Sequence, residues 1–484
     1  MFFLAFLRRH STWLMGLAAT LLLITVPLLI LIPRTAPPPD NPQARLPQRV
    51  PETDHTALLK GPYASGSDVT RACLECHSDS ARQVMATSHW TWEGEPVQPA
   101  WRTEPVTIGK KTQLNNFCIA ATGNEKKCTS CHTGYGWSDA SFDFQNPLNV
   151  DCLACHAKPD TYAKGDYGFP AAGVDLAAAA QSVRLPRREN CGACHYQGGG
   201  GENVKHGDLD PSLNFPTETL DVHMGRLDMR CTDCHTTQDH AIKGRLLGDN
   251  LTIPQSQQVQ CTDCHAPGLH EDERISAHVP NVACQSCHVP AVALKNPTKV
   301  SWDWSQAGQD RPDDHYTYLK IKGAFLYEDN VVPTYRWFNG DNSYRYLMGD
   351  QIDPSKPTMI NEPAGGIQDP KAKIAPFKVH VARQPYDTRF NILLPPRTAG
   401  EGGYWTTFDW PSALALGARD NGVKFSGAYG FTETWMFYPA THMVQLAEKA
   451  LQCEACHGPD GRMDWQALGY PGDPMKWGGR SQAK

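Results

Sequence analysis

The chain has 484 residues, enough for two or more domains, and its hydrophobic content of 40% is ordinary for a globular protein. Its net charge of −6 is mild, and no basic stripe or long run of like charge occurs, which argues against a nucleic-acid partner. Cysteine is the unusual component, with 17 residues, and its distribution along the chain carries the first functional information.

The N-terminal segment, residues 1–34, is strongly apolar after a basic flank of Arg8 and Arg9. No charged residue occurs between Thr12 and Pro33, which is about the length that spans a bilayer as a helix. A cleaved secretory signal is the alternative, but its apolar region would be shorter and a small-x-small site would follow it. The segment therefore predicts an uncleaved transmembrane anchor in the inner membrane, with the rest of the chain facing the periplasm.

Sixteen cysteines form eight C-x-x-C pairs, and each pair is followed directly by histidine. The cysteines are Cys73, Cys76, Cys128, Cys131, Cys152, Cys155, Cys191, Cys194, Cys231, Cys234, Cys261, Cys264, Cys284, Cys287, Cys453 and Cys456, and the histidines are His77, His132, His156, His195, His235, His265, His288 and His457. C-x-x-C-H is the attachment motif of c-type haem, in which two thiols bind the vinyl groups and the histidine ligates the iron. Zinc sites or disulfides would not need a histidine after every pair. The sequence therefore predicts eight covalently attached haem c groups.

The spacing of the motifs organises the chain beyond the anchor. A proline-rich segment at 35–70 predicts an extended linker, and residues 71–290 hold seven motifs in a heptahaem core. An aromatic-rich insertion without motifs follows at 291–435, and residues 436–484 hold the eighth motif on a C-terminal helix with a tail. So little protein per macrocycle predicts a mainly α or irregular multihaem cytochrome c fold, with a haem-packed core and sparse secondary structure.

Three stretches have a recognisable local pattern. Residues 174–185 and 438–457 have helical periodicity. In "PTYRWFNGDNSYRY", aromatic runs flank Asn339 and Gly340, which favours a β-hairpin. The aromatic residues of the insertion would either form a wall or lid over a haem or pack against exposed macrocycle faces.

Each haem iron has a second axial position, for which histidines outside the motifs are candidates. Seven lie in the haem-bearing regions, namely His89, His206, His223, His240, His270, His278 and His442. His55, His315 and His380 lie in the linker or the motif-free stretch, and His10 lies in the anchor. Seven distal histidines for eight haems would leave one iron with an exchangeable position, at which a substrate can bind.

The arrangement of seven clustered motifs and one distant motif resembles the octahaem tetrathionate reductase family, whose relatives include hydroxylamine oxidoreductase and the multihaem nitrite reductases. The resemblance rests on "NNFCIA" and "CTSCHTGYGW" around the second motif, "CLACHAKPDTYAKG" at the third, and "PTYRWFNGDNSYRY" and "APFKVHVARQPYD" in the insertion. Every motif ends in histidine, and no tyrosine that could crosslink to a haem is identified. Both features favour the tetrathionate branch.

The resemblance implies that the second haem is the active site and that a lysine shortly after the third motif is its distal ligand. Lys164 falls at that place, and Lys158 is a weaker candidate. The family also has a cysteine just upstream of the second motif, and Cys118 resembles it; its thiolate could exchange with a polythionate sulfur. Asn115 would face the same pocket, and Asp160 would donate or accept a proton.

The sequence thus predicts a membrane-anchored periplasmic enzyme, an octahaem oxidoreductase that reduces tetrathionate to thiosulfate at a lysine-ligated haem. Seven bis-histidine haems would relay electrons from a quinol-linked or soluble redox partner. Reduction of nitrite or hydroxylamine at the same haem is one alternative. A pure electron conduit, whose lysine-ligated haem never opens, is the other.

Overall fold

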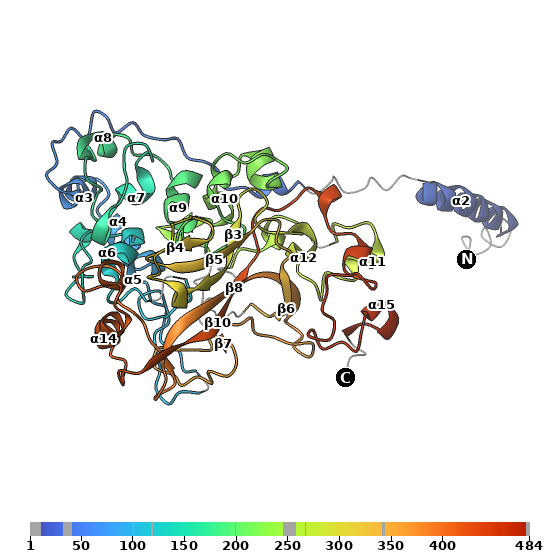
Figure 1. Ribbon diagram of the computed structural model, residues 1–484. Helices are drawn as coiled ribbons and strands as arrows, with labels where there is room; N and C mark the ends of the chain where they lie inside the picture. Colours follow the sequence, from blue (N-terminus) through green and yellow to red (C-terminus); the bar gives the residue numbers. More distant parts are fainter. Residues whose placement is uncertain are drawn as a thin grey trace. The chain divides into compact units, whose positions relative to one another are not determined.

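The structure is a computed structural model that describes residues 11–31, 41–99, 101–117, 120–198, 200–244, 258–266, 268–340 and 344–480 (Figure 1). The chain divides into two units. The first comprises residues 1–46 and 262–269, and the second comprises residues 47–261 and 270–484. The candidate residue Cys118 lies outside the described residues.

The first unit contains helix α2 (Ser11–Leu31) and a short 3-10 turn, η1 (Pro42–Arg45). Within the described residues, no helix combines the length and the apolar character that crossing a membrane requires. The predicted transmembrane helix is therefore wrong, and so is the inner-membrane, periplasm-facing location inferred from it. The sequence count treated every uncharged residue as apolar. Yet α2 contains hydroxyl side chains, two of which, Thr20 and Thr25, bond to the carbonyls of Gly16 and Leu21.

The motif-bearing part of the second unit consists of short helices joined by loops. The helices are α3 (Gly66–Leu74), α4 (Ser80–Met85), α5 (Ser88–Thr91), α6 (Glu125–Cys128), α7 (Leu153–His156), α8 (Leu176–Gln181), α9 (Arg188–His195), α10 (Cys231–Cys234), α11 (Glu273–Ser276) and α12 (Gln285–His288). Short 3-10 turns at Thr129–Cys131, Pro147–Asn149, Asp166–Gly168 and Pro211–Asn214, and a π-turn at Val222–Arg226, lie between them. This sparse secondary structure agrees with the prediction, and several helices end on a motif histidine.

Helix α8 forms inside the predicted stretch 174–185. The Asp175 side chain begins it by accepting from the backbone N–H groups of Ala177 and Ala178. Its alanines are small enough to pack closely, and Ala179 and Ala180 are fully buried beside Val69 and Leu153.

The motif-free region folds mainly as an eight-stranded sheet, which the predicted fold class did not include. Its strands are β3 (Thr298–Asp303), β4 (Tyr318–Leu319), β5 (Gly323–Glu328), β6 (Thr334–Phe338), β7 (Thr358–Met359), β8 (Lys373–Asp387), β9 (Ile392–Leu393) and β10 (Tyr429–Pro439). The order is β4-β5-β3-β8-β10-β7, with β6 and β9 also paired to β8. Figure 1 shows β8 and β10 side by side, and they run antiparallel over eleven residue pairs from Tyr429↔Asp387 to Pro439↔Phe377.

The sheet was not predicted because several buried positions of β8 carry polar side chains. Lys378, His380 and Gln384 are buried at alternate positions of this strand. A half-buried strand is recognised from apolar residues at alternate positions, and buried polar residues remove that signal. The helices α13 (Tyr404–Thr407) and α14 (Trp410–Asp420) follow β9, and Tyr404 stacks on Trp410 at a centroid separation of 4.0 Å.

The helix predicted over 438–457 does not form. Strand β10 extends to Pro439, and two 3-10 turns follow at Ala447–Lys449 and Cys453–Ala455. The backbone N–H groups of Thr441 and His442 donate to the Asp208 carboxylate, which takes the place of helical acceptors.

The predicted hairpin around Asn339 and Gly340 is replaced by a longer-range pairing. Strand β6 pairs antiparallel with β8, from Thr334↔Phe377 to Phe338↔Lys373, and Tyr344 bridges to Asn361. Residues 341–343, in the predicted turn region, lie outside the described residues. The prediction failed because it considered only neighbours in sequence, whereas β8 offers a partner with more buried surface.

Candidate haem ligands and a buried cationic chamber

Among the described residues of the second unit, six pairs of histidine rings face each other at nearly the same separation. Their ring centroids lie 6.1–6.4 Å apart in the pairs His55–His77, His89–His195, His156–His240, His235–His442, His270–His288 and His278–His457. Two metal–nitrogen bonds of about 2 Å, plus roughly 1 Å from each nitrogen to its ring centre, give about 6 Å. The spacing therefore fits one metal ion held axially between the two rings of each pair.

Each pair joins one motif histidine to one histidine from elsewhere in the chain. Five of the seven predicted distal histidines occupy such places, namely His89, His240, His270, His278 and His442. His206 instead packs its ring against Tyr438 at 5.3 Å, and His223 lies on the π-turn at Val222–Arg226. His55, which the sequence analysis placed in the linker, faces His77. No local signal marks His55, because the fold brings the linker back onto the first motif.

In seven of these histidines, Nδ1 contacts a fixed oxygen. The contacts are His55 to Thr53 O (2.9 Å), His156 to Arg184 O (3.0 Å), His235 to Lys243 O (2.8 Å), His240 to Gln83 Oε1 (2.8 Å), His278 to Arg274 O (2.7 Å), His442 to Asp208 Oδ2 (3.2 Å) and His457 to Asp473 Oδ1 (2.6 Å). An Nδ1–H that donates to such an oxygen fixes the tautomer and leaves the Nε2 lone pair for a metal. The surroundings of the pairs thus suit iron ligation.

His132, the histidine of the second motif, has different surroundings. No ring of the described histidines faces it, its Nε2 lies 2.7 Å from the carbonyl oxygen of Trp90, and its Nδ1 is buried without a partner. Aromatic rings enclose it, from Trp90, Trp92, Trp137, Phe142 and Phe144. Burial lowers the pKa of His132 to about 3, so the imidazole is neutral, as a metal ligand must be.

Lys164 lies close to this motif but is already engaged. Its Nζ donates to Asp151 Oδ2 at 2.7 Å and to Gly134 O at 3.0 Å, two residues beyond His132. Asp151 is buried and also accepts from the hydroxyls of Tyr135 and Tyr162. The buried Asp151 carboxylate needs the Lys164 charge, because removing one partner of a buried ion pair is costly.

A second amine near the same motif was not singled out from the sequence. Lys205 is partly buried, and burial together with the charge of Lys110 lowers the pKa of its amine to about 8, while a Cys131 thiolate would act in the opposite direction. Only its position in the fold marks it, since "NVKHGD" matches no motif. The other two candidates from the third-motif loop, Lys158 and Asp160, are exposed at the surface.

The buried face of β8 and β10 covers the segment just before the second motif. The Asn116 amide donates to the backbone oxygens of His380 and Thr434, and its Oδ1 lies 3.0 Å from His380 Nδ1. Gln384 donates to the backbone oxygen of Asn115 at 2.9 Å. The sheet therefore forms a wall beside the residues that precede Cys118.

Buried basic side chains gather on this wall and on the adjoining strand β3. Lys299 and Lys378 are only 1% and 2% exposed, and burial lowers their pKa values to about 6 and about 7, with the charges of Lys322 and Lys378 adding to the shift of Lys299. Lys378 donates to Val204 O at 2.6 Å, next to Lys205. His380 is fully buried, and its Nε2 has no partner among the described residues. We call Lys205, Lys299, Lys378 and His380 the cationic chamber.

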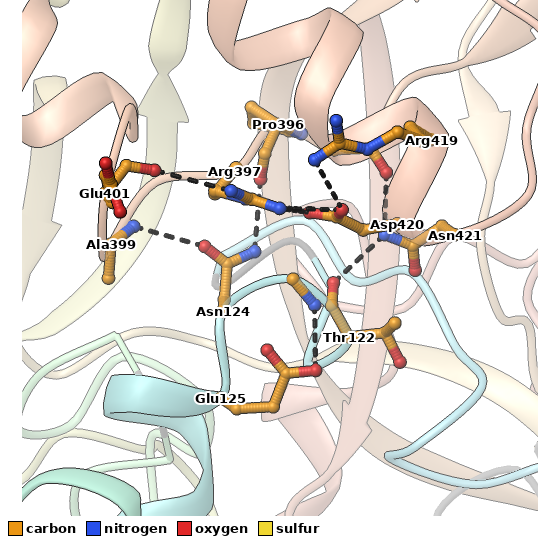
Figure 2. A network of polar contacts seen from close by, with 12 residues as sticks. Thr122, Asn124, Glu125, Pro396, Arg397, Ala399, Glu401, Arg419, Asp420 and Asn421 are labelled. Atoms are coloured by element: carbon orange, nitrogen blue, oxygen red, sulfur yellow. Dashed lines mark hydrogen bonds and ion pairs between the residues drawn. The ribbon is translucent and has the colours of Figure 1, made fainter. Parts of the chain in front are cut away.

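Polar contacts clamp the start of α6 to the end of the sheet region (Figure 2). Asn124 donates to Pro396 O at 3.1 Å and accepts from the backbone N–H of Thr398 and of Ala399. Arg397 forms a bidentate ion pair with Asp420, with contacts of 2.8 and 2.7 Å. The position of the second motif is therefore set by residues far away in sequence.

Two family descriptions match parts of the chain: "Cytochrome c554 and c-prime" over residues 72–157, and "Cytochrome c bacterial" over residues 299–460. The crystal structure of an octahaem cytochrome c from Shewanella oneidensis superposes with a TM-score of 0.82 at 45% sequence identity, covering 88% of this chain and 98% of that one. The chain belongs to the octahaem c-type cytochromes. An uncharacterised protein of Archaeoglobus fulgidus is also similar, at 27% identity over 39% of this chain and 79% of its own length.

The motifs of this octahaem cytochrome form a continuous chain in space. Cysteine thiols of different motifs lie close together, in the pairs Cys73–Cys152, Cys131–Cys194, Cys191–Cys231 and Cys261–Cys284. Further motif cysteines lie near enough to raise one another's thiol pKa, in the pairs Cys155–Cys191, Cys234–Cys261 and Cys287–Cys453. In the haem-loaded protein these sulfurs are thioethers, so we take the contacts only as a measure of closeness. The motifs follow the order 1-3-4-5-6-7-8, with motif 2 beside motif 4, which suits electron transfer between neighbouring haems.

Proposed function

We propose that this octahaem cytochrome is an oxidoreductase that reduces a small inorganic anion at the second motif, with tetrathionate as its substrate. The observation that carries the proposal is the difference in surroundings between His132 and the six paired motif histidines. When bound there, the haem supplies an iron with one exchangeable axial position. The other motifs, in their spatial order, would pass electrons from a redox partner to this site.

The cationic chamber supports an anionic substrate. In their protonated form, ammonium groups in a site of low dielectric attract an anion more strongly than they would in water. Tetrathionate and nitrite carry negative charge, whereas free hydroxylamine is neutral. The chamber therefore favours the two anions over hydroxylamine, and it favours the tetrathionate dianion over the nitrite monoanion.

We assign the distal amine of the second haem to Lys205 rather than to Lys164. Turning Lys164 towards an iron would leave the Asp151 carboxylate without its cation. Among the described residues, Lys205 forms no such ion pair. The lowered pKa of Lys205 also makes its neutral, ligating form more accessible. Lys164 then acts as a positioning residue, which holds Asp151 and the Gly134 turn beside His132.

Cys118 would supply the sulfur chemistry of the proposal. Its thiolate attacks the central S–S bond of tetrathionate, which releases one thiosulfate and leaves the other half bonded to the cysteine sulfur. Two electrons delivered through the motif chain then break this new S–S bond. The second thiosulfate leaves, and the thiolate is restored, so that one tetrathionate and two electrons give two thiosulfates.

The test is turnover by the full haem-loaded protein with reduced viologen dye, using tetrathionate, nitrite and hydroxylamine in parallel. The proposal predicts that kcat/KM is largest for tetrathionate and smallest for hydroxylamine. Equal kcat/KM values for all three substrates would show that the chamber does not select the substrate by its charge. Consumption of none, together with no cyanide binding, would identify the protein as an electron conduit.

A further inference from the structure

The eighth motif has a charged partner behind its axial histidine. The Nδ1 of His457 lies 2.6 Å from Asp473 Oδ1, the shortest of the seven Nδ1 contacts described above. The side chains of His457 and Asp473 are only 14% and 12% exposed. A buried carboxylate this close to an imidazole N–H forms a strong, charge-assisted hydrogen bond.

The carboxylate of Asp473 is held in place from two sides. Its Oδ1 also accepts from the backbone N–H of Met475 at 2.9 Å, because Asp473 caps the start of helix α15 (Pro474–Trp477). Its Oδ2 accepts from the backbone N–H of Gly458, the residue after His457, at 2.8 Å. With both oxygens fixed, the carboxylate cannot turn away from His457 without breaking three contacts.

Among the other six histidines with an Nδ1 contact described above, five have a neutral acceptor. Four of these acceptors are backbone carbonyls and one is the amide of Gln83, which lies 2.8 Å from His240 Nδ1. The second carboxylate, Asp208, is 3.2 Å from His442 Nδ1 and also accepts from two backbone N–H groups. Among these sites, Asp473 is therefore the strongest hydrogen-bond acceptor for the Nδ1–H group of an axial imidazole.

We propose that Asp473 is a tuning residue that lowers the reduction potential of the haem at the eighth motif. A carboxylate that accepts the Nδ1–H increases electron density on Nε2, and the more basic ligand stabilises the ferric iron relative to the ferrous iron. His278, whose ring lies 6.1 Å from that of His457, would complete the axial pair. This inference depends on the haem-binding family and not on the identity of the substrate.

The position of the eighth motif explains what a lowered reduction potential would achieve there. The eighth motif is at one end of the chain of motifs, joined to the seventh through Cys287 and Cys453. A haem of low potential at the end of a chain passes its electron on readily and is a poor acceptor from its neighbour. Asp473 therefore makes the C-terminal end the place where electrons from a reductant enter.

Two reciprocal substitutions test the proposal by redox potentiometry, with absorbance and electron paramagnetic resonance as readouts. Asp473→Asn keeps the shape and an acceptor oxygen but removes the charge, and the midpoint potential of one haem should rise. Gln83→Glu places a carboxylate against His240, and the potential of another haem should fall. For a one-electron couple, a tenfold change in the reduction equilibrium corresponds to about 59 mV.

Asp460→Asn is the matched control, because Asp460 is exposed and lies three residues from His457. It removes the same charge without touching the imidazole, and its titration should match that of the unmodified protein. Equal shifts in Asp460→Asn and Asp473→Asn would overturn the proposal, as would an unshifted Asp473→Asn curve. Haem content, measured as the pyridine haemochrome, verifies loading. If Asp473→Asn fails to load haem, an unshifted Gln83→Glu protein overturns the proposal.

Discussion

The six paired histidine sites and the site of His132 share the C-x-x-C-H motif, but they differ in what lies opposite the motif histidine. In the paired sites, a second imidazole lies opposite the motif histidine. Contacts such as those of His156 and His235 to backbone carbonyls fix the orientation of the motif imidazole. At His132 no described histidine lies opposite, and a sheet with buried lysines lies beside the preceding segment. The difference shows that C-x-x-C-H alone does not decide between electron transfer and catalysis. The residues opposite and around the histidine do.

The largest effect is expected from removing the proposed distal amine. Lys205→Met should lower kcat for tetrathionate at least about 100-fold or leave the second haem permanently open, and in either case the spectrum of one haem changes. Lys164→Met should instead lower the thermal unfolding temperature, because Asp151 is left as an unpaired buried charge. Steady-state kinetics, absorbance spectra and thermal unfolding of both variants decide between them, with exposed Lys158→Met as the control. A spectral change in Lys164→Met alone would reverse the assignment.

Removing one ring of a pair should convert that site into a second open haem. In His55→Ala the iron at His77 loses its facing imidazole, so the protein should bind one more cyanide than the unmodified protein does. His315→Ala is the control, since the ring of His315 packs against Tyr316 and Tyr327 and faces no motif histidine. An unchanged cyanide stoichiometry in His55→Ala would show that His55 is not an axial ligand.

A smaller effect is expected from the charge of the chamber. The pKa values of Lys299 and Lys378, lowered by burial to about 6 and about 7, mean that both ammonium groups lose protons as pH rises from 6 to 8. The value of kcat/KM for tetrathionate should therefore fall over this range. Lys378→Met should lower it about tenfold at pH 6 and flatten the profile, since about 1.4 kcal/mol corresponds to a factor of ten. Exposed Lys371→Met should leave the profile unchanged, and a flat profile in the unmodified protein would contradict this role of the lysines.

The haem attachment sites could be predicted because their chemistry is local. Two thiols and an imidazole must stand at fixed spacing, so the motif is visible in five consecutive residues. Distal ligands have no such requirement. His55 could not be separated from a linker residue, because only the fold decides which ring comes opposite a motif.

The sheet and the chamber were missed for a related reason. In β8 the polar residues Lys378, His380 and Gln384 occupy buried positions, so the strand lacks the alternation that usually identifies one. Lys378 and His380 are buried residues of β8 that weaken its sequence signal. The same two residues belong to the cationic chamber. The predicted helix at 438–457 failed because Tyr438 pairs across the sheet with Lys378. Functional residues and errors of prediction therefore coincide here, as expected where a site departs from ordinary packing.

The central claim is that the second haem differs from its neighbours in having an exchangeable axial position. Cyanide titration of the oxidised, fully loaded protein, followed by absorbance and electron paramagnetic resonance, counts such positions directly. One cyanide should bind per chain of eight haems, with loss of tetrathionate turnover in proportion to binding. Binding at no haem, or at several, would contradict this claim.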